Sequence, residues 1–177
     1  MKKLYAVITL IVIALLTLSA CGTGAPATPA GEELKIGVVT DVGQLEDKSF
    51  NQAAYEGGKA AAEKLGATFD VIVTQNISDY KQNIQTFVDQ GFDVIITVGF
   101  LIGTDTTIAA KANPNVKFIG VDQGICVDEE GAPDPTFTCA GDAAKLLPNY
   151  QGIVFAEEQA GYLAGIVAGS LSKTGTI

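Results

Sequence analysis

The stretch "LKIGVVTDVGQLEDKSFNQAAYEGGKAAAEKLG" from Leu34 to Gly66 decides the fold. Its first residues are nearly all apolar or β-branched, which is typical of a buried strand. The residues from Phe50 to Leu65 then have helical spacing. Ser49, with Gln52 three residues later, has the pattern of a capping box, and Gly66 stands where a C-cap glycine is expected. A strand that leads directly into a helix indicates an α/β protein.

The same pattern recurs along the chain. Apolar, β-rich runs at 68–74, 93–98 and 116–121 predict further strands, and segments with helical spacing at 80–88 and 104–112 lie between them. Since strands that are nearly continuously apolar are buried on both faces, we predict a parallel sheet with helices on both faces. Such a sheet is half of a doubly wound α/β fold.

The pattern changes after Asp122, where a loop rich in Gly, Pro and Asp begins. It resumes with a predicted strand at 152–155 and a long helical segment at 157–171. We expect residues 34–155 to form one α/β lobe. Because the last residues have the pattern of a further strand, we expect the sequence to be a piece of a longer protein, in which 156–177 leads into a second lobe that is missing or truncated.

The N-terminal residues have the pattern of a bacterial lipoprotein leader. Two Lys residues and an apolar run precede "LSAC" at 18–21, which resembles the lipobox where a signal peptidase cuts before a lipid-modified Cys. We expect a signal peptide at 1–20 and, at 21–33, a lipidated Cys21 with a flexible tether, which would hold the protein on the outer face of the cell membrane. An uncleaved transmembrane anchor is the alternative, but the apolar run is shorter than the roughly 20 residues that cross a bilayer.

The composition argues against nucleic-acid binding and against catalysis. The formal charge is −9, from 11 Lys and no Arg against 20 acidic residues, and such a surface repels phosphate backbones. The chain has no His, the commonest general base and metal ligand, so we expect neither an enzyme nor a cofactor. The acidic residues 128–130 and Asp134 lack the order of a calcium-binding loop, so we expect no metal site there.

Two cysteines besides Cys21, Cys126 and Cys139, flank a loop rich in Gly, Pro and Asp. In an exported protein such a pair favours a disulfide, worth about 3 kcal/mol in the chain-entropy model. Two free thiols are the alternative, because the sequence does not show how far apart the Cα atoms lie.

Ligands of an open α/β sheet bind at the carboxyl ends of the strands. The first turn of this chain has only one glycine, Gly43, and lacks both glycine patterns that hold phosphates. Acidic residues near it would also oppose an anion, so we predict a neutral ligand. Polar or aromatic residues follow each of the predicted strands in the first lobe: Asp41, Gln75 with Asn76, Gly99 with Phe100, and Asp122.

Phe50 and Asn51, at the start of the first helix, are further candidates. An aromatic ring at this position either stacks on a ligand or packs into the core as a staple. Asn51 can donate and accept hydrogen bonds and Asp122 accepts them, so together they suit a ligand with hydroxyl and amide groups. An aromatic face with such polar groups is how bases and nucleosides are held.

Several motifs together resemble one family. They are "DVGQLEDKSFNQAAYEG" at 41–57, "IITVGF" at 95–100, "NPNVKFIGVD" at 113–122 and "FAEEQAGYLAGIVAGSLSKTG" at 155–175. From Leu34 on, the chain is similar to the basic membrane protein family. Members of that family are lipoproteins that bind substrates for ABC importers, and those characterised mostly bind purine nucleosides.

The resemblance implies a periplasmic-binding-protein type I lobe, flavodoxin-like, that faces a second lobe across a cleft. It implies a base held between one aromatic residue from each lobe, with polar groups on the sugar. It also implies permease and ATPase subunits as partners and a lipid anchor to the membrane. The implied ligand-binding residues are Asp41, Phe50, Asn51, Gly99, Phe100 and Asp122.

Two alternatives keep the fold and change the role. One is a ligand-sensing or structural surface lipoprotein that signals to a membrane partner. The other is a binder of a different neutral ligand, such as a sugar or a flavin. In either case one lobe alone provides only half of the contacts, so we expect it to bind weakly without the other lobe.

Overall fold

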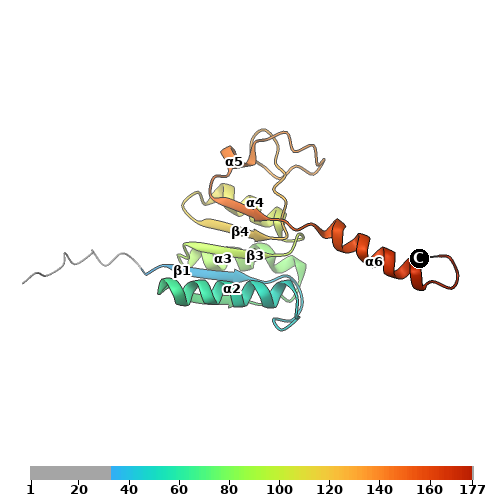
Figure 1. Cartoon of the computed structure of the whole chain (residues 1–177). Coiled ribbons are helices and arrows are strands. Elements are labelled where there is room, and N and C mark those ends of the chain that lie inside the picture. Colours follow the sequence, from blue (N-terminus) through green and yellow to red (C-terminus); the bar gives the residue numbers. More distant parts are fainter. Residues whose placement is uncertain (1–32, 177) are drawn as a thin grey trace, which may run out of the picture. The chain divides into compact units, whose positions relative to one another are not determined.

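A computed structural model describes residues 33–176, which form an α/β fold around one sheet, and this confirms the predicted fold class. All neighbouring strands are parallel, in the order β2-β1-β3-β4-β5 (Figure 1). Along the chain the strands are β1 (Lys35–Val39), β2 (Thr68–Ile72), β3 (Val94–Val98), β4 (Lys117–Val121) and β5 (Tyr150–Ile153).

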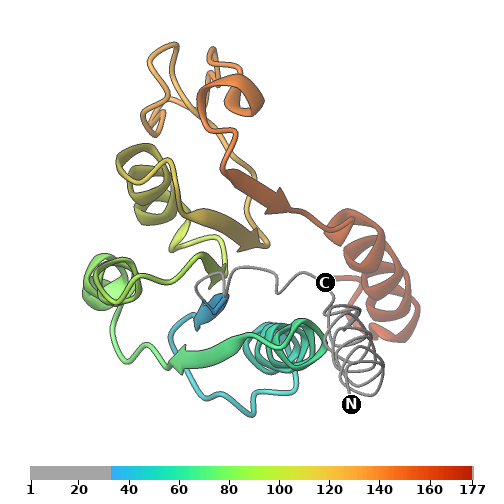
Figure 2. The same cartoon turned by 90° about the vertical axis from the view of Figure 1, so that its left-hand side faces the viewer.

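Helices lie on both faces of the sheet. α2 (Phe50–Leu65) lies on one face, whereas α3 (Tyr80–Asp89) and α4 (Gly103–Ala112) lie on the other (Figure 2). The remaining helical segments are η1 (Ile77–Asp79), α5 (Ala143–Leu146) and α6 (Glu157–Leu171).

The main core lies between the sheet and α3. Tyr80, Ile84 and Phe87 are at most 1% exposed, and their spacing places them on one face of the helix, as predicted for 80–88. They belong to one apolar cluster with Ile95 of β3. Gly37 of β1 makes room for the Phe87 ring, because a Cβ atom at this position would lie 2.8 Å from a ring carbon.

The predicted elements between 34 and 121 are confirmed to within two residues, and the helix at 157–171 is confirmed as α6. β5 begins at Tyr150 and ends at Ile153, whereas the sequence predicts a strand at 152–155. The short segments η1 and α5 have no sequence prediction. The predicted leader, Cys21 and almost all of the tether lie outside the described residues, as does Ile177, so these expectations stay predictions.

The loop between β4 and α5 contains the two cysteines. Cys126 and Cys139 form a disulfide, so the alternative of two free thiols does not hold in this structure. Val127 and Pro133 form an isolated antiparallel bridge within the loop. The bond and the bridge hold together a segment that otherwise has no regular strand or helix.

α6 differs from α2, α3 and α4 because none of its residues is buried. It has no charged residue after its first turn, which contains Glu157 and Glu158. Helices with so little polar surface are normally covered by protein. None of the helices within residues 33–176 is both long and apolar enough to cross a membrane. The large apolar side chains that α6 exposes are Tyr162, Leu163, Ile166, Val167 and Leu171.

Candidate ligand-binding site

The candidate site lies where β1 and β3 end side by side. The chain leaves these neighbouring strands toward opposite faces of the sheet, since α2 follows β1 and α4 follows β3 (Figure 2). This divergence is the topological switch point at which open α/β sheets bind ligands. Asp41 follows β1 and Gly99 follows β3, and the structure brings these two predicted site residues into contact.

The Asp41 carboxylate is held in one orientation. Its Oδ1 atom accepts hydrogen bonds from the backbone N–H of Val42, at 2.7 Å, and from the hydroxyl of Tyr80. The other side of the carboxylate lies against Gly99, where a Cβ atom would come 2.9 Å from Asp41 Cγ. Gly99 also has a φ of 92°, a backbone conformation that favours glycine. Gly99, which the sequence predicts as a site residue, therefore makes room for the Asp41 carboxylate.

Asn51 braces the loop after β1. Its Oδ1 atom accepts a hydrogen bond from the N–H of Asp41 at 2.9 Å, and its Nδ2 atom donates to the carbonyl oxygens of Asp41 and Gln44, each at 3.4 Å. The residue is only 3% exposed. The sequence suggested that Asn51 was available for a ligand, but here its amide is used to shape the loop. A direct ligand contact by Asn51 stays a prediction.

Asp47 caps the helix that carries Phe50. Its carboxylate accepts hydrogen bonds from the N–H groups of Ser49 at 2.7 Å, Asn51 at 3.2 Å and Gln52 at 3.1 Å. Burial acts to raise the pKa of Asp47, but these N–H groups outweigh it and lower the pKa. The predicted capping box of Ser49 and Gln52 is wrong, because the Ser49 side chain makes no cap bond and Gln52 Oε1 accepts from Lys48 N–H.

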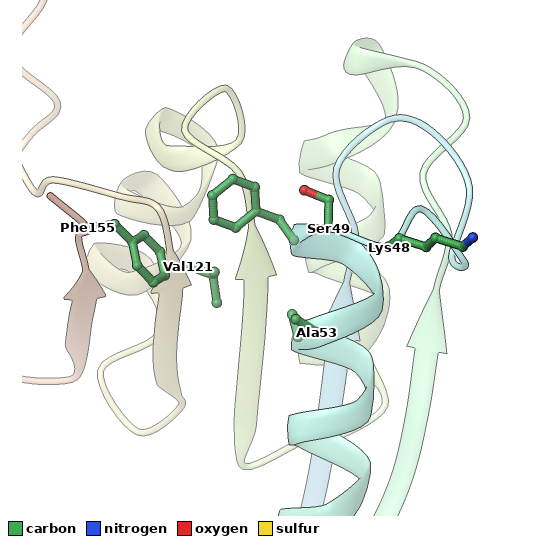
Figure 3. A pocket seen from close by; sticks show the side chains of 7 residues that line it. Lys48, Ser49, Ala53, Val121 and Phe155 are labelled. Carbon is green, nitrogen blue, oxygen red and sulfur yellow. The ribbon is translucent and has the colours of Figure 1, made fainter. Parts of the chain in front are cut away.

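Phe50 lines an open pocket of about 510 Å³ together with Phe155, which comes just after β5 (Figure 3). The two ring centroids are 5.5 Å apart and the ring planes are inclined by 53°. Lys48 also lines the pocket, but Figure 3 shows its side chain directed away from the Phe155 ring. The lining is therefore largely apolar and aromatic. It consists of Lys48, Ser49, Phe50, Ala53, Ala54, Val121 and Phe155.

Both rings are available to a planar ligand. Phe50 is 40% exposed and Phe155 is 47% exposed, so neither ring is part of the buried core. Stacking a flat ring between two others needs about 7 Å, twice the optimal carbon–carbon separation. At 5.5 Å the two phenylalanines contact each other instead. A planar ligand would therefore stack on one ring or separate the pair.

Phe100 lies in a different pocket from Phe50. The Phe100 pocket, of about 700 Å³, lies between the start of α4 and the disulfide-containing loop, and Phe137 of that loop lines it too. Phe100 is 69% exposed. The two predicted aromatic candidates are thus not brought together.

Asp122 has a left-handed backbone conformation after β4, with a φ of 60°. Burial, followed by hydrogen bonding and charge repulsion from Glu157, raises the pKa of its carboxyl group. The acid that acts on Asp122 is therefore at the start of α6. No group of three or more potential metal ligands occurs among the residues that the structure describes.

Sequence reasoning missed Phe155, Tyr80 and Glu157. Phe155 had a recognisable signal, since it is an aromatic residue at the end of the strand predicted at 152–155. The helical spacing of Tyr80 indicates only a core residue. Nothing in this spacing indicates that its hydroxyl reaches Asp41.

A family model described as ABC transporter substrate-binding protein PnrA-like matches residues 34–177. The chain belongs to this family. Basic membrane protein A of Borreliella burgdorferi, which carries the name of the family that the motifs resemble, is 28% identical over 177 residues, and the match covers all of this chain and 45% of that protein. The predicted family is therefore confirmed.

A relative from Lactococcus carries a name that refers to transport. The ABC transporter nucleoside-binding protein BmpA of Lactococcus lactis subsp. cremoris is 29% identical over 183 residues, which cover 99% of this chain and 47% of that protein. The chain spans about half the length of the curated relatives that it matches.

Solved structures of similar fold include solute-binding proteins of ABC transporter systems. The protein from Aeropyrum pernix K1 has a TM-score of 0.57 and 25% identity, and the match covers 76% of this chain and 32% of that one. The protein from Conexibacter woesei has a TM-score of 0.53 and 26% identity, with coverage of 79% and 41%. The fold described above is therefore the fold found in a lobe of solute-binding proteins.

Proposed function

We propose that the complete protein captures a nucleoside, preferably a purine nucleoside, and delivers it to an ABC importer. The observation that carries this proposal is the pair of exposed phenylalanines, Phe50 and Phe155, at the carboxyl edge of the sheet. Exposed aromatic rings bind the flat faces of bases by stacking, with about 1–3 kcal/mol for each base. The name of the Lactococcus relative and the family of this chain support the same ligand class.

The acidic and polar groups near the rings suit an uncharged ligand with hydrogen-bond donors. Asp41 is a fixed acceptor, and its backbone N–H donates a hydrogen bond to Asn51, the residue after Phe50. Asp122 and Glu157 add further acceptors at the same edge. Carboxylates accept hydrogen bonds from sugar hydroxyls and base N–H groups, and they repel phosphates. A nucleoside fits this arrangement better than a nucleotide.

Calorimetry of the full-length gene product would test the ligand. Inosine, guanosine, adenosine and cytidine should be compared with ribose and a flavin under the same conditions. We expect the purine nucleosides to bind most tightly, because they offer both a large stacking surface and hydroxyl donors. Binding of ribose without binding of any nucleoside would contradict the proposal.

We also propose that the protein is held at the extracytoplasmic face of the cell membrane by a lipid on Cys21. The support is the lipobox-like sequence at 18–21 and the lipoprotein name of a relative in Pyrococcus horikoshii. Cys21→Ser should abolish incorporation of labelled palmitate and move the protein out of the membrane fraction, because acyl chains provide the anchoring free energy. Retention of the variant in the membrane fraction would favour an uncleaved anchor.

A further inference from the structure

We propose that Tyr80 is a positioning residue of the solute site, which fixes the Asp41 carboxylate so that Oδ2 is presented to the solute. Tyr80 reaches this carboxylate from α3, whereas Asp41 follows β1. The proposal rests on the proposed function, because it assigns Asp41 to ligand binding. Tyr80 itself contacts the acid and not the ligand.

The hydrogen bonds divide the two carboxylate oxygens into different roles. Oδ1 is used by the Val42 N–H and the Tyr80 hydroxyl. Oδ2 has no hydrogen-bond partner among the described residues, and no buried side-chain polar atom of these residues lacks a partner. Oδ2 of Asp41 is therefore not fully buried, although it is the carboxylate atom that lies against Gly99. An oxygen without a partner at this position can accept a hydrogen bond from a ligand.

Tyr80 can hold the acid because it is itself immobile. Its side chain is fully buried in the main apolar cluster, together with Ile84 and Phe87. Burial and the neighbouring Asp41 raise its pKa to about 12, so the hydroxyl remains a donor across the physiological range. A donor fixed in this way restricts rotation of the Asp41 carboxylate before any ligand arrives.

Gly99 limits the carboxylate from the other side. The acid lies where the Cβ atom of any larger residue at position 99 would be, and it would have to move if that atom were present. Tyr80, Val42 and Gly99 together leave one orientation for the Asp41 carboxylate. Preorganisation of this kind strengthens binding, because the loss of side-chain freedom does not have to occur during association.

The test uses Tyr80→Phe in the full-length gene product, with Tyr150→Phe as the matched control. Tyr150 is also a buried tyrosine with a hydroxyl hydrogen bond, to Gln123, so the control removes the same group elsewhere in the lobe. We expect Tyr80→Phe to weaken binding of the tightest purine nucleoside about tenfold, the usual size of one hydrogen bond to a charged group. Tyr150→Phe should leave the affinity unchanged.

A double-mutant cycle separates positioning from general damage. In an Asp41→Asn background, Tyr80→Phe should cause no further loss of affinity, because the carboxylate that it positions is gone. Asp41→Asn alone should also lower the pKa of Tyr80. NMR of the labelled tyrosine Cζ atom would measure this change. Equal affinity of Tyr80→Phe and the unmodified protein, or additive losses in the cycle, would overturn the positioning role while nucleoside binding stands.

A different result would overturn the proposed function itself. If the unmodified protein binds no nucleoside and no other solute through Asp41, both the function and the positioning role are wrong. The first calorimetric titration, before any substitution, distinguishes this outcome from failure of the positioning role alone.

Discussion

At the scale of single residues, Phe50 and Phe155 lie far apart in the sequence, and their rings contact each other at the carboxyl edge of the sheet. Each ring covers part of the other, at a centroid separation of 5.5 Å. Exposing an apolar ring to water is unfavourable in free energy. Contact between the two rings reduces the exposed apolar area when no ligand is present. A ligand that separates the two rings therefore replaces an existing aromatic contact.

Phe50→Ala should weaken nucleoside binding by about 1–3 kcal/mol, the usual value of one base–aromatic stack. Phe137→Ala is the matched control, because Phe137 is 80% exposed but lines the other pocket. Calorimetry of the full-length gene product would measure both. If Phe50→Ala binds as tightly as the unmodified protein, Phe50 does not stack on the ligand.

Asp122→Asn should change how stability depends on pH. The pKa of Asp122 is raised by burial and by Glu157, so the folded protein binds more protons than the unfolded chain between the ordinary pKa of about 3.9 and the raised value. The free energy of unfolding contributed by this group therefore falls as pH rises through that window. Asparagine tolerates the left-handed backbone and cannot ionise.

Urea unfolding near pH 4 and pH 7 would test this prediction, since the other titrating groups are common to both proteins. As the pH rises from 4 to 7, the free energy of unfolding should fall less in the variant than in the unmodified protein. An identical loss in both proteins would show that the Asp122–Glu157 pair does not titrate in this range.

The sequence predicted part of this site for clear physical reasons. Asp41 and Phe50 follow directly from the rule that ligands bind at strand ends, and the structure places both there. The buried role of Asn51 and the separate pocket of Phe100 depend on how loops fold back. Such side-chain partners, like Tyr80 for Asp41, are set by tertiary contacts and have no local signal.

At the scale of elements, the start of α2 shows how one acid organises a site. Asp47 accepts the N–H groups that a helix leaves unpaired in its first turn, and so it fixes the helix end that presents Phe50. A carboxylate is a stronger acceptor than the Ser49 hydroxyl, and it also interacts favourably with the helix dipole. This explains why the predicted capping box does not form, although the helix bounds were predicted correctly.

Asp47→Ala should lower the free energy of unfolding by about 0.5–2 kcal/mol, the usual effect of removing an N-cap side chain. Ser49→Ala is the control and should change it little, because the Ser49 side chain makes no cap bond. Chemical denaturation followed by circular dichroism would measure both variants. A larger effect of Ser49→Ala than of Asp47→Ala would contradict this assignment of the cap.

At the scale of the whole described lobe, α6 is a helix of 15 residues that buries none of them. Its exposed apolar residues lie on a helix with no charge beyond the first turn. The fold class was predictable because most strands are largely apolar and helices such as α3 have one apolar face. The order of the strands was not, since pairing between distant segments depends on tertiary packing and not on local pattern.

A protein made of residues 33–177 should bind a hydrophobic dye and self-associate, because exposed apolar patches of this kind favour association. Leu163→Gln with Val167→Gln is the control, since both residues are exposed and their replacement leaves the core intact. Dye fluorescence and light scattering after size-exclusion chromatography would measure the effect. Equal dye binding by both proteins would show that α6 is not the apolar surface responsible.

The strand order also has a consequence for biosynthesis. β1 pairs with β2 on one side and β3 on the other, as when Val38 aligns with both Val71 and Ile96. β4 then adds to β3, and β5 adds to β4. From β2 onward, each strand that leaves the ribosome or the secretion channel meets an edge that has already been made. The sheet can therefore assemble in the order of translation, without waiting for a later segment to be inserted between two earlier ones.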